Sequence, residues 1–280
     1  MPCPPEPPRP PIEAQVERAN AGGRVPIVFL PGLWLLPGSW DRWAAVFGEA
    51  GFPAVLPTWP ADPPPTPSAA GHAGSAPWTV GEVAGHVAGV IGRLERKPVV
   101  VGHSFGGLLA QILAGDGLAA ATVAIAPAPE RGVLPLPISP PRAPARPGGA
   151  GRAVPLTYDQ FRHSFANAAG EEEARRLHER YAVPAPGAPP PRTAALDPWN
   201  DTEVDAAAPA RGPLLLISGE LDRTAPWPVT RAAYERQARN AHHRTEIAEL
   251  PGRGHSLIVD GGWREVCGTA LTFIQRYVCP

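Results

Sequence analysis

Three residues of this chain have the types and the order that activate a hydroxyl group for nucleophilic attack. Ser104 lies in the pentapeptide GHSFG, which has the pattern G-x-S-x-G. A serine hydroxyl becomes a strong nucleophile when a histidine takes its proton and a carboxylate orients that histidine. Asp222 in "LLLISGELDRTAP" and His255 in "ELPGRGHSL" follow the serine in the order acid, then base. The pattern predicts a catalytic triad of Ser104, Asp222 and His255.

Neighbouring carboxylates offer alternatives for the acid. Glu220 lies two residues before Asp222, and Asp222 itself could be a turn residue or a helix cap. Asp260 comes after the histidine, which is the wrong order, and Glu130 lies too far beyond its strand. Asp222 is the predicted acid because it follows a buried strand closely, and the carboxyl ends of strands face the functional crevice.

Eight histidines compete for the role of base. His255 follows the last predicted strand in a glycine-rich loop, and none of the others does. His103 is adjacent to the serine, but neighbouring side chains on a strand point to opposite faces. The remaining histidines, several of them in predicted helices or polar connections that suit surface roles, are His72, His86, His163, His178, His242 and His243.

The serine motif also predicts where a developing oxyanion is stabilised. In a tight strand-to-helix turn, the N–H of the residue after the nucleophile, here Phe105, faces the oxyanion. A second donor comes from the loop after the first buried strand, "FLPGLWLLPGSW", where we expect the N–H of Leu33, with that of Trp34 as a further candidate. Pro31-Gly32 alone would indicate a simple turn, and its combination with the serine motif favours the donor interpretation.

The context of the serine motif separates it from other glycine-rich turns. The buried run "VVVGH" ends just before the serine, and the helix-like "FGGLLAQILAG" follows it. A dinucleotide fingerprint needs G-x-G-x-x-G, and a Walker loop needs Gly-Lys followed by Ser or Thr; the motif has neither. The turn strains the serine backbone and places its hydroxyl at a helix N-terminus, where negative charge is favoured.

Six apolar runs predict the strands that position these residues. They are short and bounded by turn residues, and most are nearly continuous in apolar residues, which is typical of strands buried on both faces. Helical patterns alternate with them, at about 79–94 with Thr79 as the cap, at 105–115, at 228–239 and from 263 onward. The alternation predicts a parallel sheet with helices on both faces. The predicted strands lie within 24–32, 53–60, 99–103, 121–127, 213–219 and 245–250.

Proline and glycine divide the chain into three parts. Residues 1–22 are rich in proline and are predicted to be a disordered tail. An α/β core is expected over 23–127 and 211–280. Residues 128–210 interrupt it with few strand signals and many loops, which predicts a helical, loop-rich cap inserted over the functional edge of the sheet. The helical stretches of this cap are 157–168, with Thr157 as the N-cap, and 171–181.

Composition excludes several classes of protein. The 280 residues carry a formal net charge of -1, which gives no electrostatic case for binding nucleic acid or an acidic membrane. Cys3, Cys267 and Cys279 are odd in number and lack C-x-x-C spacing, which argues against a disulfide framework and against a zinc site. We find no signal-peptide core and no run long enough to span a membrane, so we expect a cytoplasmic protein. The motifs imply no metal and no organic cofactor.

Taken as a set, these motifs resemble the α/β-hydrolase fold superfamily. The resemblance rests on "IVFLPGLW", "VVVGHSFGG", "LLLISGELDRTAP" and "GRGHSL", and covers the chain from about residue 25, with 127–210 matching only as the variable cap. "PGLWLLPGSWDRW" and "RGVLPLPISPP" are similar to a narrower group of bacterial hydrolase-like proteins known mainly by their fold. The implied fold is α/β, a mostly parallel sheet of about six main strands with helices on both faces and an inserted cap.

Two features depart from the pattern of this superfamily. Many relatives have His-Gly where this chain has Pro31-Gly32, which leaves the shape of the oxyanion loop open. The two leading strands are missing, because residues 1–22 are too rich in proline for a hairpin, so we expect six main strands instead of eight. The resemblance implies acyl transfer to Ser104, followed by hydrolysis by water activated at His255.

The expected reaction is hydrolysis of a small, largely apolar carboxylic ester or lactone. Relatives of this fold use the same triad for C–C bond cleavage and for specialised biosynthetic steps, and a non-catalytic binding protein is a further alternative. Dehalogenase and epoxide hydrolase chemistry is disfavoured, because those relatives use Asp as the nucleophile. The oligomeric state stays open. Aromatic residues expected at the mouth favour an apolar substrate, although core packing would also explain them: Trp34, Trp59, Phe105, Phe161 and Phe165.

Overall fold

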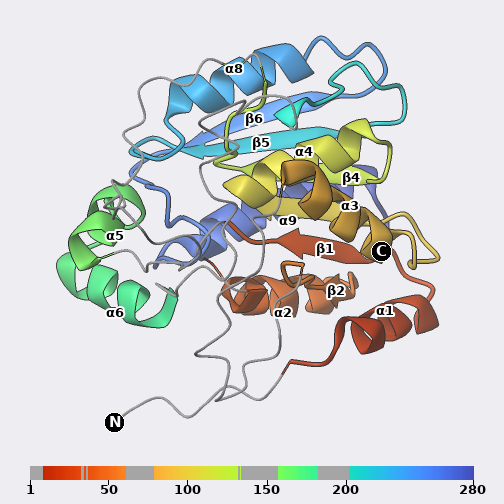
Figure 1. Cartoon of the computed structure of the whole chain (residues 1–280), viewed down its shortest axis with the longest axis horizontal. Helices are drawn as coiled ribbons and strands as arrows, with labels where there is room; N and C mark the ends of the chain where they lie inside the picture. Colours follow the sequence, from red (N-terminus) through yellow and green to blue (C-terminus); the bar gives the residue numbers. More distant parts are fainter. Residues whose placement is uncertain are drawn as a thin grey trace, which may run out of the picture.

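A six-stranded parallel sheet lies at the centre of the molecule (Figure 1). The computed structural model describes residues 9–32, 35, 37–60, 79–131, 133, 157–181 and 202–280. The strands are β1 (Ile27–Leu30), β2 (Ala54–Val55), β3 (Val99–His103), β4 (Ala121–Ile125), β5 (Leu214–Gly219) and β6 (Thr245–Leu250). Their order is β2-β1-β3-β4-β5-β6, with every neighbouring pair parallel. The predicted α/β fold with about six main strands is confirmed.

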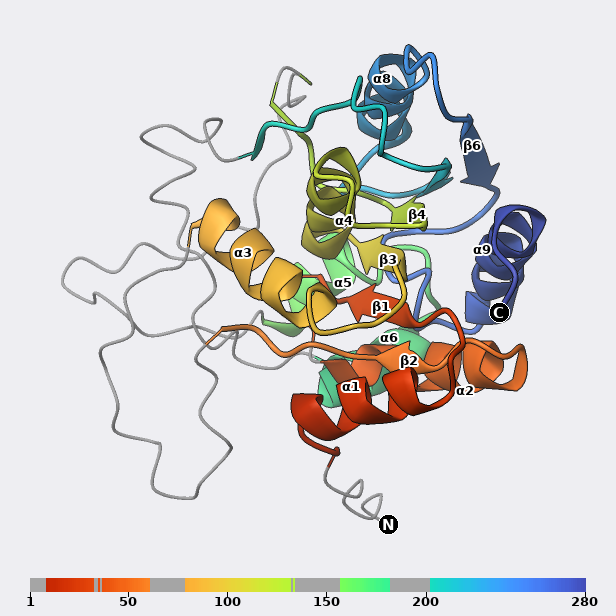
Figure 2. The same ribbon diagram turned by 90° about the vertical axis from the view of Figure 1, so that its right-hand side faces the viewer.

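The central strands bury both faces, which explains their continuous apolar runs. In β3, Val99 and Val101 pack on one face and Val100 on the other. A fully buried Val or Leu stabilises the fold by about 1.5–3 kcal/mol, so the strand ends are held firmly. Figure 2 shows the helices on the two sides of the sheet. One face carries α2 (Asp41–Glu49) and α9 (Trp263–Tyr277), and the other carries α3 (Val80–Ile91), α4 (Phe105–Gly115) and α8 (Trp227–Gln237).

The N-terminal segment differs from the expectation. Part of residues 1–22, predicted to be a disordered tail, forms helix α1 (Ile12–Ala21), so the prediction is wrong for that stretch. The prolines stop at Pro11, the N-cap residue, and the apolar face of α1 packs against the β2 edge of the sheet. Gln15 fixes this contact, because its Oε1 accepts a hydrogen bond from the N–H of Leu56 at 2.8 Å.

An aromatic cluster joins the segment 37–49 to β1. The short 3-10 helix η1 (Pro37–Trp40) and α2, neither of them among the predicted elements, bring Trp40, Trp43 and Phe47 against Phe29 of β1. The ring centroids lie 5.0 to 6.4 Å apart in stacked and edge-to-face arrangements, which are favourable geometries for aromatic pairs. The cluster fixes α2 beside the first strand.

The helices of the predicted insertion lie beyond the carboxyl ends of the strands (Figure 1). Helix α5 (Tyr158–Ser164) begins after Thr157, whose side chain forms a capping box with Gln160, so the predicted N-cap is confirmed. Helix α6 (Glu171–Tyr181) follows and packs on α5. Both therefore stand at the edge where residues that follow the strands emerge.

Helix α3 begins with a capping box of its own. Thr79, the predicted cap of α3, accepts a hydrogen bond from the N–H of Glu82, and the Glu82 side chain returns the bond to the N–H of Thr79. Such a pair satisfies two donors that a helix start otherwise leaves free. None of the helices within the described ranges has both the length and the hydropathy needed to cross a membrane.

Candidate active site

Ser104 occupies a strained backbone position between β3 and α4. Its φ of 54° and ψ of -117° are rare for residues other than glycine and cost about 1–3 kcal/mol. Hydrogen bonds hold it there. Its N–H donates to the carbonyl of Ile125 at 2.9 Å, and its own carbonyl accepts from the N–H groups of Gly107, Leu108 and Ala128. The backbone is thus fixed on both sides, while the serine side chain is only half-buried.

Close backbone contacts require the two outer glycines of the serine motif. A Cβ atom at Gly102 would overlap the backbone of Gly106, and one at Gly106 would overlap the carbonyl of Leu30 at the end of β1. Only glycine lets α4 begin so close to β3 and β1. The spacing G-x-S-x-G is therefore explained by the packing that surrounds the serine.

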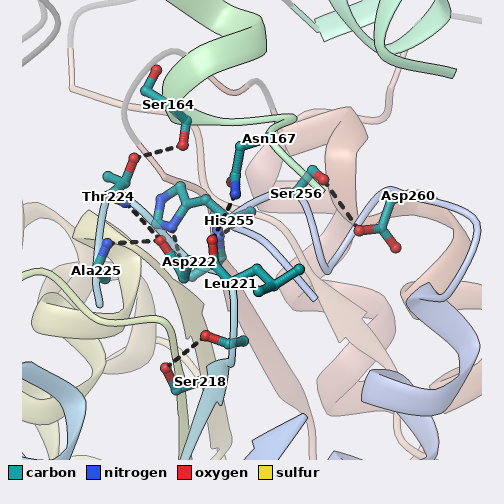
Figure 3. Close-up of polar contacts among 12 residues, drawn as sticks. Ser164, Asn167, Ser218, Leu221, Asp222, Thr224, Ala225, His255, Ser256 and Asp260 are labelled. Carbon is teal, nitrogen blue, oxygen red and sulfur yellow. Dashed lines mark hydrogen bonds and ion pairs between the residues drawn. The ribbon is translucent and has the colours of Figure 1, made fainter. Parts of the chain in front are cut away.

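His255 and Asp222 form a buried hydrogen-bonded pair (Figure 3). Nδ1 of His255 lies 2.7 Å from Oδ2 of Asp222. A carboxylate oxygen only accepts, so Nδ1 carries the proton of this bond, and in the neutral imidazole Nε2 keeps its lone pair. The other oxygen, Oδ1, accepts from the N–H groups of Thr224 and Ala225, each at 2.8 Å. Three donors therefore hold the carboxylate in the orientation that fixes the imidazole.

Contacts from the insertion hold the Asp222 loop from outside (Figure 3). Oγ1 of Thr224 donates to the carbonyl of Ser164, at the end of α5, at 2.8 Å. On the other side of Asp222, Nδ2 of Asn167 donates to the carbonyl of Leu221 at 2.6 Å. The loop is consequently tied to the insertion through both of its ends.

Helix α2 anchors the loop that carries His255. Nε1 of Trp43 donates to the carbonyl of Ile258 at 3.0 Å, and the guanidinium of Arg42 donates to the carbonyl of Val259. Both acceptors lie within four residues of His255 in the sequence. Because α2 was not predicted, the sequence reasoning missed an element that positions this loop.

The alternative acids have other partners. Asp260 accepts a hydrogen bond from Oγ of Ser256 at 3.1 Å, and burial raises the pKa of its carboxyl group. Glu220 is exposed and accepts from a turn amide. The carboxylate that contacts the ring of His255 belongs to Asp222.

Gly32, two residues after β1, lies close to the serine. A Cβ atom at Gly32 would lie 3.1 Å from Cβ of Ser104. On the other side, Phe105 begins α4, and the first N–H groups of a helix have no acceptor within it. The remaining predicted oxyanion donors, Leu33 and Trp34, lie outside the described residues, so their role stays a prediction.

The predicted substrate-contact residues separate into two groups. Phe165 meets the ring of His255 edge-on, with centroids 5.8 Å apart. Phe161 packs behind Phe165 and is nearly fully buried between α5 and α6, as expected for a packing residue. Phe105 pairs with Trp59 at 5.5 Å, within the cluster on the α3 and α4 side of the sheet. The residue that lies against the histidine is therefore Phe165.

His103 lies against His255, a contact that the sequence reasoning missed. Its Nε2 is 2.9 Å from the carbonyl oxygen of His255, and the two ring centroids are 4.6 Å apart. Burial, and then the charge of His255, hold the pKa of His103 well below its ordinary value. Strand alternation places His103 with Val99 and Val101, on the face where residues 257–259 pack. The alternation indicates the face that His103 occupies, but not which loop folds onto that face.

The other described histidines are on the surface or pack within the insertion. His86, His163 and His242 are exposed, and His178 packs edge-on against Phe161; His72 lies outside the described residues. Among the residues that the structure describes, no group of three or more His, Cys, Asp or Glu side chains could hold a metal ion.

A protein-family model described as "Alpha/beta hydrolase family" matches residues 27–267. This span runs from the first residue of β1 into α9 and includes Ser104, Asp222 and His255. Among curated proteins, no sequence matches this chain.

Solved structures with the same fold cover almost the whole chain. A monoacylglycerol lipase from Paleococcus ferrophilus has 20% identity and a TM-score of 0.64, over 91% of this chain and 96% of that one. A carboxylesterase structure from Nitrososphaera gargenis has 16% identity and a TM-score of 0.66, over 91% and 92%. A thermophilic esterase from Thermogutta terrifontis has 16% identity and a TM-score of 0.58, over 91% of each chain. At these identities the likeness shows the fold.

Proposed function

Because this chain belongs to the alpha/beta hydrolase family, we propose that it is a serine hydrolase that cleaves a small, largely apolar carboxylic ester or lactone. The observation that carries the proposal is the buried pair of His255 and Asp222, with Nδ1 and Oδ2 2.7 Å apart. Their loops follow β6 and β5, and Ser104 follows β3, so all three leave carboxyl ends of one parallel sheet. The lipase and esterases of similar fold support an ester as the substrate.

In the acylation step, Oγ of Ser104 attacks the carbonyl carbon of the ester while its proton passes to Nε2 of His255. The tautomer supports this direction, because the proton on Nδ1 is held by Asp222 and Nε2 is free to accept. The negative oxygen of the tetrahedral intermediate is stabilised by the N–H of Phe105 and by a donor from the loop that follows Gly32. When the intermediate collapses, Nε2 gives its proton to the departing alkoxide oxygen.

In the deacylation step, a water molecule attacks the acyl-enzyme on Ser104. Nε2 of His255 takes a proton from the water, and the proton then returns to Oγ as the serine leaves. The acid product is released, and the enzyme regains its starting state. A lactone follows the same two steps, but its alcohol remains attached to the acyl chain as a hydroxy acid.

Apolar substrates are favoured by the side chains around His255. Phe165 packs nearly at right angles to the ring of the histidine, with the ring centroids 5.8 Å apart. The carboxylate of Asp222 is nearly fully buried and already accepts three hydrogen bonds, so it offers little to a polar substrate group. We therefore expect acyl or alcohol groups that are short and apolar.

The first experiment compares hydrolysis of p-nitrophenyl esters, from acetate to palmitate, by the wild type and two serine variants. Ser104→Ala removes the nucleophile. Ser218→Ala is the matched control, because Ser218 is a fully buried serine on β5 whose hydroxyl makes one long hydrogen bond to a neighbouring carbonyl, at 3.4 Å. We expect a preference for short chains, loss of at least about 10³-fold in rate for Ser104→Ala, and near wild-type rates for Ser218→Ala.

A serine-reactive phosphonate provides a second readout that does not depend on the ester chosen. We expect one phosphonyl adduct, located on Ser104 by peptide mass mapping and absent from Ser104→Ala. A folded wild type that takes the label and hydrolyses no ester would turn the proposal toward C–C cleavage or a biosynthetic reaction by the same triad. A protein that neither labels nor turns over would leave a binding role.

A further inference from the structure

His103 connects the strand of the nucleophile to the loop of the base. It is the last residue of β3, directly before Ser104, and its side chain is fully buried. Its Nε2 lies 2.9 Å from the carbonyl oxygen of His255, which is 152 residues away in the sequence. A carbonyl only accepts, so Nε2 of His103 carries the proton. The bond therefore joins two segments that must keep a constant separation during catalysis.

The charge state of His103 suits its position. Burial, followed by the charge of His255, lowers the pKa of His103 well below its usual range, so its ring is neutral. In the proposed reaction His255 becomes a cation, and a second imidazolium in contact with it would oppose that change. A neutral ring supplies a hydrogen bond and a contact surface without this repulsion.

The ring of His255 is enclosed by three side chains from three segments. Asp222 holds Nδ1, and the ring of His103 lies 4.6 Å away at an angle of 45°. Phe165 meets both imidazoles edge-on, at 5.8 Å from His255 and 6.2 Å from His103. Rotation or displacement of His255 would break at least one of these contacts.

We propose that His103 is a positioning residue, which holds His255 where Nε2 can reach the hydroxyl of Ser104. The kinetic part of this inference rests on the proposed function. Because His103 and Ser104 are adjacent on β3, a shift of the His255 loop relative to the serine must stretch the hydrogen bond from His103. A misplacement of about 1 Å costs about 10²-fold in rate, so we expect the loss of this hydrogen bond to lower kcat.

The test compares His103→Leu with His103→Gln, whose amide Nε2 can donate to the same carbonyl. We expect kcat to fall about 10- to 100-fold in His103→Leu with KM changed less than about threefold, and to recover most of its value in His103→Gln. Thr122→Val is the matched control, since Thr122 is fully buried on the neighbouring strand and its hydroxyl has no hydrogen-bond partner. It should leave kcat unchanged.

A spectroscopic readout follows the position of His255 independently of any substrate. The Nδ1 proton shared with Asp222 gives a downfield NMR resonance, assigned by its loss in Asp222→Asn. We expect this resonance to shift or broaden in His103→Leu, to return in His103→Gln, and to stay in place in Thr122→Val. If His103→Leu does not fold, His103→Asn replaces it, because its amide is too short to reach the carbonyl.

Two outcomes would overturn the inference. One is an unchanged kcat together with an unchanged resonance in His103→Leu or His103→Asn. The other is an equal loss of kcat in the Gln variant and in the Leu or Asn variant, which would show that the hydrogen bond does not account for the loss. A wild type that hydrolyses no ester would overturn only the proposed function, because the resonance still reports on His255.

Discussion

The segments that follow β4 and β5 each carry a buried carboxylate, and the two differ sharply in their surroundings. Asp222, after β5, receives two backbone N–H groups at 2.8 Å and the imidazole of His255 at 2.7 Å. Glu130, after β4, is fully buried, and neither of its oxygens has a hydrogen-bond partner. Its nearest cation, Nε of Arg236, is 3.8 Å away, too long for a hydrogen bond.

The difference shows that donors, more than depth of burial, decide what a buried carboxylate can do. Burial raises the pKa of Glu130 to about 7, and Arg236 offsets this only in part. A carboxyl group in that state exchanges a proton near neutral pH. Asp222, with its three donors, is instead equipped to stay fixed against His255 throughout a reaction.

The largest effect should come from exchanging the donor pattern at Asp222. Asp222→Asn places an amide where Nδ1 of His255 needs an acceptor, which disfavours the productive tautomer. We expect kcat for the best ester of the panel to fall about 10⁴-fold. Glu130→Gln, the matched isosteric change in the neighbouring segment, should alter kcat less than about threefold. Comparable losses in both variants would break the distinction.

Glu130 should instead control how stability depends on pH. Its pKa rises from the ordinary value of 4.5 in the unfolded chain to about 7 in the folded protein. Below pH 4.5 the group is protonated in both states, and its contribution to stability is fully present. As pH rises from about 4.5 to about 7, ionisation of this group in the unfolded chain withdraws that contribution. The loss is on the order of 3 kcal/mol in unfolding free energy and is complete once the folded group also ionises.

Urea unfolding at pH 5 and pH 8 measures this contribution. We expect Glu130→Gln to remove the part of the pH dependence of stability that comes from this group. The unfolding free energy of the variant, relative to that of the wild type, should therefore be higher at pH 8 than at pH 5. Arg244→Gln, a change at an exposed position, serves as a control that should preserve the wild-type slope. A Glu130→Gln profile parallel to the wild type would show that Glu130 titrates normally.

A smaller effect tests which contacts support Asp222. Thr224→Val removes the hydroxyl that donates to Ser164 at 2.8 Å and keeps the backbone N–H that donates to Asp222. We expect a loss of about 1 kcal/mol in unfolding free energy and only a few-fold change in kcat. A kcat loss approaching that of Asp222→Asn would mean that the insertion, and not the loop backbone, orients the acid.

The smallest effect concerns Arg236 beside Glu130. Arg236→Met removes the cation that lowers the pKa of Glu130, so this pKa should rise further. In this variant the decline of stability should then extend to higher pH than in the wild type. The change in unfolding free energy at neutral pH should be a few tenths of a kcal/mol, because Arg236 is partly exposed. Arg236→Lys keeps the charge and should restore the wild-type midpoint in the same unfolding titration.

Local patterns predicted much of the fold. Strands buried on both faces must be apolar throughout, so β3, β4 and β5 could be read directly from their sequences. The capping residues Thr79 and Thr157 were likewise visible, because their hydrogen bonds reach only three residues along the chain. Helix α1 was missed since the prolines before Pro11 dominated the composition of the whole N-terminal segment.

The candidate site was predictable where chain order mattered and hidden where distant loops meet. The order of Ser104, Asp222 and His255 follows from the strands that precede them. The contact of His103 with His255 depends on where a loop 152 residues away folds back, which no local pattern contains. The lack of hydrogen-bond donors around Glu130 could not be predicted either, because the absence of a donor produces no sequence pattern.

The order of the strands has a consequence for where a substrate can enter. β1 and β3 are neighbours, although β2 lies between them in the chain. After β1 the chain crosses to β2 through α2 on one face, and after β3 it crosses to β4 through α4 on the other. Connections that diverge in this way create a topological switch point, where open α/β sheets bind their ligands. Gly32 and Ser104 flank that point, so we expect a substrate to approach the serine there.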